Sequence, residues 1–491
     1  MGIPRHPWKS ALLPALIAGC VLSACAVGPN FHRPAAPAVS AYLPESLPEK
    51  TVEAPGIAGA AQRFLAEGGI AADWWKSFNS AELNALVSEA LKANPNVAAA
   101  QAALREALEN TAAQRANYWP QLQGNFDATR QRNATGVLSP TLSNGVSVFN
   151  LYTPQVTVSF VPDLFGGNRR QVESLAALAD NARFELDATY LTLTNNVIAT
   201  VIEVAGLQEQ IRATERIVAL YHESLDVLNR SLELGAVAEA DVDAQETALA
   251  QAEATLPPLR HQLETQRHQL AVLTGHLPAE APSLELKLSG LQLPTDIPVG
   301  IPSQLVERRP DVLAAEAQLH AATAQVGVAE AAMLPQFTIT AGAGSTATAI
   351  SDLFKDGTGF WSVGGNLSQT LFAGGALYHK KRAADAAVDA AGATYRATVL
   401  AAFQNVADAL HALTSDADAL QASARAAQAA ENSFNIARRQ LELGSVSYLF
   451  LILSEQNYLQ TQIALISSQM NRLADTAALF QSLGGAPLPG P

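Results

Sequence analysis

Residues 231–237 read SLELGAV and residues 440–446 read QLELGSV, so the tetrapeptide LELG occurs twice in the chain. Apolar residues at seven-residue spacing lead up to each copy: Tyr190, Val197, Val204, Ile211, Val218, Leu225 and Leu232 before the first, and Val399, Val406, Leu413, Leu420, Ala427, Phe434 and Leu441 before the second. This period imposes a left-handed coiled coil. Similar columns resume after each copy, and Gly suits the left-handed end of a helix. The sequence therefore predicts two long helical hairpins with Gly235 and Gly444 at their tips.

Other markers repeat in the same order, which indicates two structural repeats. They are Asn94-Pro95-Asn96-Val97 with Arg309-Pro310-Asp311-Val312, Pro120-Gln121 with Pro335-Gln336, and Leu164-Phe165-Gly166-Gly167 with Leu371-Phe372 and Gly374-Gly375. We expect the first repeat at 73–275, a Pro-rich linker at 276–303, the second repeat at 304–485 and a tail at 486–491. The helix from Asn168 to Leu234 should be about 100 Å long. Pro257-Pro258 should kink or break the helix that returns from the first tip.

Each repeat also contains two segments in which apolar and polar residues alternate. The expected strands are Leu122–Arg130, Tyr152–Phe160, Phe337–Gly344 and Ser362–Phe372, with loops rich in Gly, Ser, Thr and Asn between the paired strands. Strands with one apolar and one polar face are typical of barrels in outer membranes.

Four strands are too few to close a barrel, since about eight leave an interior just wide enough for side chains. Open edges cannot face lipid, so several chains must contribute strands. The predicted fold class is α+β: long coiled-coil hairpins combined with four strands per chain that join an oligomeric barrel.

The N-terminus has the features of a secretory signal. Arg5 and Lys9 precede an apolar run, and Leu22-Ser23-Ala24-Cys25 resembles the lipobox of bacterial lipoproteins. We expect residues 1–24 to be removed, Cys25 to be acylated, and residues 25–72 to form a tether rich in Pro and Ala. In the lipoprotein pattern an Asp after the Cys favours the inner membrane, so Ala26 favours the outer membrane. The alternative is a Cys that ends an ordinary signal by coincidence.

Together these features resemble the TolC-like outer-membrane factors, in particular the NodT-type lipoprotein branch that serves tripartite resistance-nodulation-division pumps. The resemblance runs from about Asp73 to Gly485 and includes Trp74-Trp75, Asp163-Leu164-Phe165-Gly166 and the Leu-Gly tips. It implies a homotrimer with a 12-stranded outer-membrane barrel and a helical tunnel across the periplasm. It also implies a periplasmic adaptor docked at the tips and an inner-membrane pump. The matching tip residues are Leu234, Gly235, Val237, Leu443, Gly444 and Val446.

One departure concerns the periplasmic gate. Several relatives carry acidic residues a few positions after the second tip Gly, whereas this chain has Tyr448, Phe450 and Leu453, with Glu455 as the nearest carboxylate. Apolar rings can gate a pore by dewetting. Ordinary packing of Phe450, Leu451 and Leu453 between helices is the competing interpretation.

Other function classes find little support in the sequence. A net charge of -14 without a block of Lys or Arg argues against nucleic-acid binding. His261, His268 and His276 are spaced too widely to share one metal ion, and no Ser/His/Asp constellation is recognisable. We expect no catalysis, no cofactor and no metal site, but an efflux duct anchored in the outer membrane. The alternatives are the exit duct of a type I protein-secretion system and a periplasmic coiled-coil lipoprotein.

Overall fold

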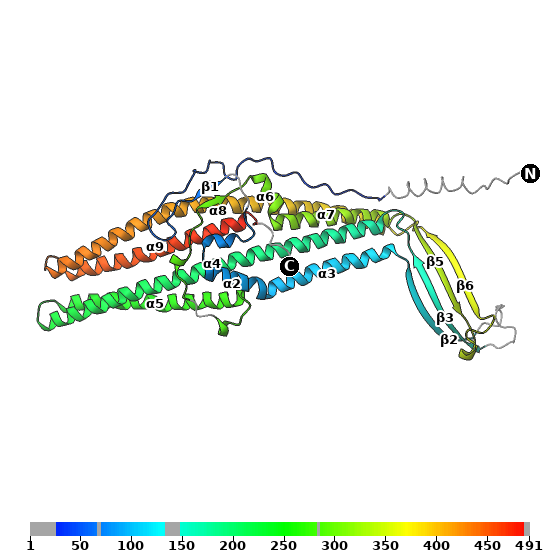
Figure 1. Ribbon diagram of the computed structural model, residues 1–491, viewed down its shortest axis with the longest axis horizontal. Helices are drawn as coiled ribbons and strands as arrows, with labels where there is room; N and C mark the ends of the chain where they lie inside the picture. The colour runs from blue at the N-terminus through cyan, green and yellow to red at the C-terminus, as the bar shows by residue number, and fades with distance from the viewer. Residues whose placement is uncertain (1–25, 66–69, 133–147, 282–284, 486–491) are drawn as a thin grey trace, which may run out of the picture. The chain divides into compact units, whose positions relative to one another are not determined.

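The computed structural model describes residues 26–65, 70–132, 148–281 and 285–485 (Figure 1). Long helices dominate, together with a four-stranded antiparallel sheet and a small parallel sheet of β1 (Arg63–Leu65) and β4 (Asp296–Pro298). Cys25, the expected signal and the expected tail lie outside the described residues.

The two halves of the chain present the same order of elements. The first half contains α2 (Ala81–Ala93), α3 (Pro95–Arg115), β2 (Gln121–Arg132), β3 (Val148–Phe160), α4 (Gly167–Glu233) and α5 (Glu239–Leu273). The second contains α6 (Pro302–Arg308), α7 (Pro310–Ala331), β5 (Gln336–Ser345), β6 (Gly359–Ser368), α8 (Ala376–Glu442) and α9 (Tyr448–Ser482). Short 3-10 turns, such as η2 (Trp74–Phe78), connect some of them. The predicted two-repeat fold class is confirmed.

The helical hairpins match each other in length. Helices α4 and α8 have 67 residues each, and α5 and α9 have 35 residues each. Of the kink or break expected at Pro257-Pro258, the break is wrong, because α5 runs through both prolines as one helix. Leu256 and Leu263 are buried on either side of them, so packing offsets the lost backbone hydrogen bonds.

Helix α4 is also the one helix among the described residues with a window apolar enough for a membrane span. The mean hydropathy of that 18-residue window is 1.2, and 61% of it is buried inside the protein. This composition fits the buried side of a long packed helix.

The large sheet has the strand order β2-β3-β5-β6, with every neighbouring pair antiparallel. Three of the predicted strands are confirmed to within a few residues. The fourth was expected to reach Phe372, but β6 ends at Ser368. Ser368 pairs with Gln336, and the residue before Gln336 is Pro335, which has no N–H with which to extend the ladder.

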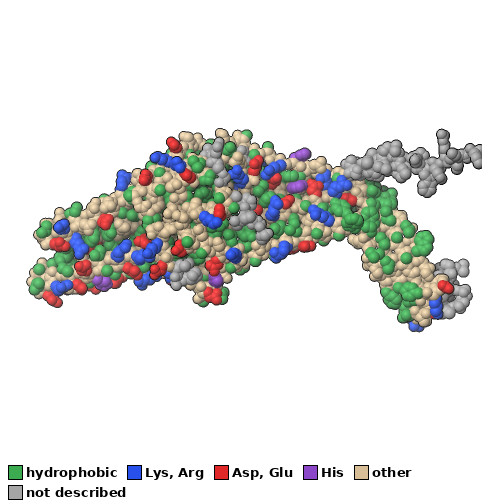
Figure 2. All heavy atoms as spheres, in the orientation of Figure 1, with side chains coloured by type: hydrophobic (Ala, Val, Ile, Leu, Met, Phe, Trp, Pro, Cys, Tyr) green, Lys and Arg blue, Asp and Glu red, His purple; other side chains and the backbone are tan. Residues whose placement is uncertain are grey.

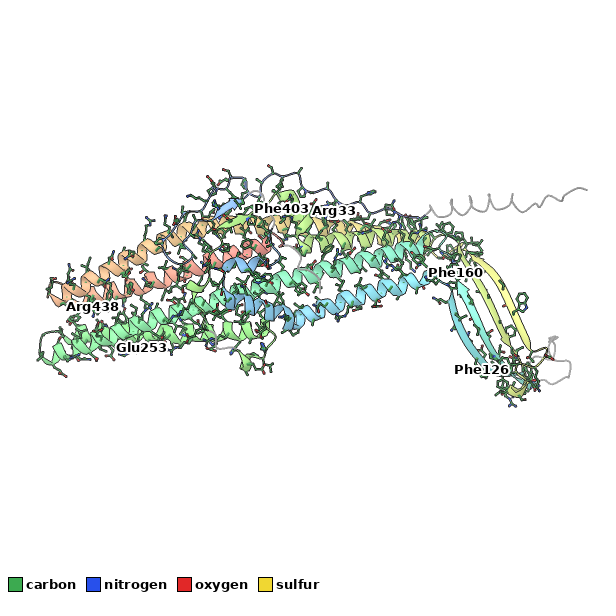
Figure 3. All side chains as sticks on the ribbon, in the orientation of Figure 1. Arg33, Phe126, Phe160, Glu253, Phe403 and Arg438 are labelled. Carbon is green, nitrogen blue, oxygen red and sulfur yellow. The ribbon has the colours of Figure 1, made fainter. Side chains whose placement is uncertain are left out.

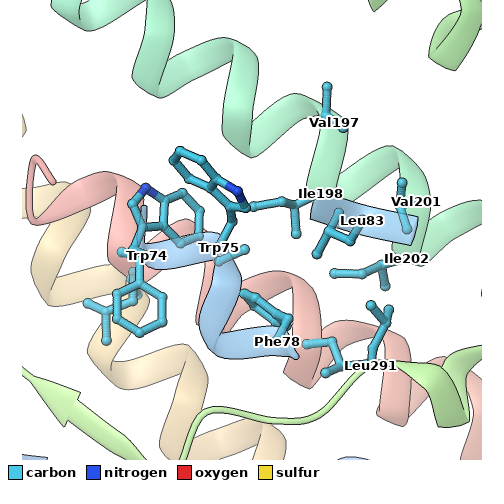
Figure 4. Close-up of a cluster of buried hydrophobic side chains, with 14 of the residues drawn as sticks. Trp74, Trp75, Phe78, Leu83, Val197, Ile198, Val201, Ile202 and Leu291 are labelled. Atoms are coloured by element: carbon cyan, nitrogen blue, oxygen red, sulfur yellow. The ribbon is translucent and has the colours of Figure 1, made fainter. Parts of the chain in front are cut away.

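The chain divides into two compact units. One comprises the described parts of Met1–Arg33, Arg105–Asn181 and Glu316–Thr394, and includes the large sheet. The other comprises the described parts of Pro34–Leu104, Ala182–Ala315 and Tyr395–Pro491. Figure 4 shows the core of this second unit, where Trp75 lies beside Ile198 of α4 and Phe78 lies beside Leu291. Trp74 stacks on Phe480 of α9 with ring centroids 5.3 Å apart. The Trp pair near the start of the first repeat therefore belongs to the core of this unit.

Candidate functional site

The four-stranded sheet has one continuous apolar face. Leu122 on β2 lies opposite Val158 on β3, Val158 lies opposite Ala341 on β5, and Ala341 lies opposite Val363 on β6. Residues directly opposite each other in a sheet point to the same side. Trp361, Val363 and Leu367 extend this face along β6 and are all exposed. Figure 2 shows apolar side chains gathered over the strands, with few charges among them.

The other face of the sheet is polar. One row across it consists of Gln123, Thr157, Gly342 and Ser362, and these residues lie opposite one another in strand order. The neighbouring row begins with Gln121 and Ser159. Such a two-faced sheet suits a wall between lipid and water, because the apolar face can meet hydrocarbon and the polar face a hydrated lumen.

Aromatic residues mark both ends of the apolar face. Figure 3 shows Phe160 at the end of the strands that leads into the helices and Phe126 towards the opposite end. Phe126 stacks on Tyr152 with ring centroids 6.5 Å apart. Trp119, just before β2, and Phe372, just after β6, are strongly exposed at the helical end. Aromatic girdles at both interfaces are typical of outer-membrane strands.

The hairpin tips have the same geometry in both repeats. Gly235 and Gly444 each have a φ of 68°. The N–H of Gly235 donates to the Leu232 carbonyl at 2.9 Å, and the N–H of Gly444 donates to the Leu441 carbonyl at 2.9 Å. The residue after each Gly donates further back, to Ser231 and Gln440 respectively, which is the pattern of a Schellman cap. Both glycines end their helices in the predicted left-handed conformation.

The side chains of the tips are open to solvent. Leu234 is 84% exposed and Leu443 is 78% exposed, whereas Val237 and Val446 are half-buried. Helix α5 starts two residues after Val237, and Asp241 Oδ2 accepts the N–H of Ala238 at 3.2 Å. Asp241 therefore caps the start of α5. Each tip presents an exposed leucine at a fixed turn.

The candidate gate residues do not share one environment. Within this chain Leu451 is buried beside Phe434, so it packs between helices as the competing interpretation has it. Phe450 and Leu453 are 45% and 55% exposed, and Tyr448 is half-buried. Phe450 and Leu453 therefore remain available for contacts outside this chain's own core.

Glu455 lies in the core of its own chain. Its side chain is 2% exposed, and its Oε2 atom has no hydrogen-bond partner among the described residues. Burial raises the pKa of this carboxyl to about 7, although a hydrogen bond with Ser224 and the charge of Arg438 act in the opposite direction. The hydroxyl of the nearby Tyr221 on α4 is buried without a described partner as well. Glu455 faces α4 and not an open lumen.

A second acidic site, made of half-buried residues, was missed in the sequence. Burial and a hydrogen bond with Asp475 raise the pKa of the Asp416 carboxyl to about 7, while the charge of Arg472 lowers it. Arg472 is fully buried, and its Nη2 donates to Thr51 Oγ1 at 2.9 Å and to the Ala60 carbonyl at 2.8 Å. A pair of carboxyl groups from α8 and α9 therefore lies beside a guanidinium that holds the N-terminal segment.

The protein-family model for outer membrane efflux proteins matches residues 86–276 and 301–485 of this chain. The chain belongs to the outer membrane efflux protein family. Its members are channel proteins, and the channel lies in the outer membrane with a long periplasmic tunnel. This chain is an exit duct for efflux by a tripartite pump, whose other components are an adaptor and an inner-membrane pump.

Individual relatives cover nearly the whole chain. The pyoverdine export outer membrane protein OpmQ of Pseudomonas putida is 28% identical over 84% of this chain and 87% of its own length. The toluene efflux pump outer membrane protein TtgC of Pseudomonas putida is 28% identical over 97% and 95%. The solved structure of the outer-membrane channel OprN is 28% identical and superposes with a TM-score of 0.82, covering 95% of this chain and 100% of that one. The alternating segments are strands, as a channel requires and a simple coiled-coil lipoprotein does not.

Proposed function

We propose that three copies of this chain form one duct through the outer membrane. The observation that carries this proposal is the pair of open edges, β2 and β6, on a sheet that is apolar on one face. Alternate strands run in opposite directions, so β6 of one copy and β2 of the next are antiparallel and can pair. Three sheets of four strands give an even-numbered antiparallel barrel, which leaves no edge in lipid.

The helices complete the duct in this proposal. Heptad faces that remain exposed in one chain would pack against neighbouring copies, and the polar face of the sheet would line the lumen. Phe450, Leu453 and Tyr448 would meet their counterparts near the periplasmic end. We assign the two repeats to 73–275 and 304–485, the linker to 276–303, and the lipid anchor to Cys25 at the start of the mature chain.

The hairpin tips are the proposed docking surface for the adaptor. Leu234 and Leu443 are exposed at the ends of matching hairpins, and each stands beside a glycine that fixes the turn. Val237 and Val446 flank them. The names of OpmQ and TtgC refer to the export of pyoverdine and toluene, so small molecules are the favoured cargo. This choice favours an efflux duct over a duct for protein secretion.

A cysteine scan across the sheet edges tests the trimer. Cysteines placed one at a time along β2, each combined with one cysteine at Ser362 of β6, should yield crosslinks between chains in outer membranes. The same scan on β3 and β5 serves as the control, because both of these strands already have two neighbours within the chain. Crosslinked species that contain two or four chains but never three would overturn the proposal, and so would a stable monomer in mild detergent.

A further inference from the structure

Residues 26–33, the start of the described chain, make specific contacts with side chains of α4 and α7. Arg170 on α4 is 4% exposed and donates to this segment through two of its nitrogens. Its Nε donates to the Val27 carbonyl at 3.1 Å, and its Nη2 donates to the Gly28 carbonyl at 3.1 Å and to Asn30 Oδ1 at 2.8 Å. The N–H of Val27 donates to the Phe165 carbonyl at 3.1 Å. The segment is thus held mainly through its backbone.

Side chains of the segment are held as well. Phe31 stacks on His320 of α7 with ring centroids 4.4 Å apart, and His320 Nε2 lies 3.0 Å from Glu173 Oε1. Glu173 also accepts Arg170 Nη1 at 2.8 Å, so one carboxylate orients both Arg170 and His320. Arg33, labelled in Figure 3, donates from Nε to Glu316 Oε2 at 2.9 Å.

Glycines allow the segment to approach so closely. A Cβ on Gly28, which has a φ of 92°, would overlap the backbone of Gly327 on α7. A Cβ on Gly327 would lie 2.7 Å from Arg170 Cγ and 2.8 Å from the Val27 carbonyl oxygen. A Cβ on Gly166 would lie 2.7 Å from Ala26 Cα. Three close contacts of this kind indicate that the surface formed by Gly166, Arg170 and Gly327, called the receptor below, is complementary in shape to residues 26–33.

The receptor lies where the sheet meets the helices. Phe165 and Gly166 belong to the turn between β3 and α4, six residues or fewer after Phe160, the last residue of β3. Exposed aromatic residues such as Trp119 and Phe372 lie at this end of the strands, and such residues are typical of a membrane interface. Ala26 touches this turn, and Cys25 is the residue before Ala26 in the sequence.

We propose that residues 26–33 and their receptor form an anchor-positioning site, with Arg170 as its positioning residue. This N-terminal clasp fixes the point at which acyl chains on Cys25 leave the protein, at the level of the aromatic residues. The inference rests on the proposed lipidation of Cys25. A free tether of 25–72 would let the anchor enter the membrane anywhere within reach, whereas the clasp confines it to one side of the strand–helix junction.

Proteolysis of labelled protein tests the clasp. Cells expressing the full chain are fed radioactive palmitate, and their outer membranes are treated with chymotrypsin, which cleaves after Phe31. Cleavage after Phe31 separates the labelled N-terminal peptide from the rest of the chain. In Gly327→Ala and Arg170→Lys this loss of label from the chain should be roughly tenfold faster than in the parent, because the segment is cut in proportion to the fraction of time it is open. Gly392→Ala is the matched control, since its new Cβ would have no neighbour closer than 4.0 Å. Arg169→Lys controls for the charge, because Arg169 is exposed.

The outcomes separate the clasp from the lipid. Equal cleavage of Gly327→Ala and Gly392→Ala in intact oligomers would overturn the clasp. If the parent takes up no palmitate, the lipid anchor fails, while mass spectrometry of a new N-terminus at His32 still measures opening. Asn30→Ala removes an acceptor from the segment without changing a helix, and it decides the case should Gly327→Ala fail to assemble.

Discussion

Gly235 and Gly444 adopt the same left-handed backbone, and no atom lies within 4 Å of the Cβ that either would carry after substitution. A valine at either site would therefore be penalised by its own backbone, by about 1–2 kcal/mol, and not by a clash with the rest of the protein. This penalty is too small to unfold the protein but large enough to shift or fray a tip. We expect Gly235→Val and Gly444→Val to keep normal amounts of assembled protein while reducing export and adaptor crosslinking.

The control for this prediction is Ala236→Val, which adds the same side chain beside the glycine without its positive φ. Export and adaptor crosslinking should be measured in strains with equal amounts of oligomer. Parent-like values in both glycine variants would rule out the tips as the docking surface.

The acidic pair of α8 and α9 should make stability depend on pH. The pKa of Asp416 is raised to about 7, so the folded chain keeps a proton that the unfolded chain releases near pH 4. The unfolding free energy contributed by this site therefore falls as pH rises from about 4 to about 7 and levels off above it. The groups that face Asp416 are Asp475 and Arg472.

Asp416→Asn should flatten this dependence. The parent is expected to lose thermal stability between pH 5 and pH 8, and the variant to lose less, as followed by circular dichroism in detergent. Asp418→Asn, at an exposed position on the same helix, should behave like the parent. An unchanged pH profile in Asp416→Asn would show that this carboxyl is not the source.

Among the elements, β3 offers a direct test of which face meets lipid. Val156 belongs to the apolar face and Gln155 to the polar face, and both lie near the middle of the paired region. An arginine on the lipid side near the bilayer centre costs about 2–4 kcal/mol. Val156→Arg should therefore reduce the assembled protein in outer-membrane fractions much more than Gln155→Arg. Similar losses from both changes would contradict the orientation.

The helices and strands were predictable because each is encoded by a local period. The columns around Leu232 and Leu441 define long helices, and the alternation around Val156 and Val158 defines a strand. The error at the end of β6 arose because the local pattern continues beyond the point where the partner strand ends. Leu371 and Phe372 are apolar like the strand residues before them, but the end of β6 is set by Pro335, the residue just before β5.

The sites between elements were not predictable in the same way. Asp416 and Asp475 are 59 positions apart in sequence and meet only because α8 and α9 fold back on each other. Arg170 looks like any arginine near a helix start, and its role depends on Gly327 and on residues 26–33. Such contacts depend on pairing across the chain, which one sequence does not encode by spacing.

At the scale of the whole molecule, the anchor and the pore should be separable. We expect Cys25→Ser to take up no palmitate and to yield less assembled protein, while the channels that do form keep the conductance of the parent, because the pore wall consists of strands and helices. Palmitate labelling and single-channel recording measure the two properties. Label that persists in the mature variant would contradict the assignment of Cys25.

The matched lengths of α4 and α8, and of α5 and α9, have a consequence for how such a chain can evolve. Deleting one heptad from each arm of one hairpin alone would pull its tip back by about 10 Å relative to the other. A partner that binds both tips would then lose its contacts with one of them. Insertions and deletions in the hairpins should therefore occur in pairs, one in each half of the gene. Only then do the two hairpins keep equal lengths.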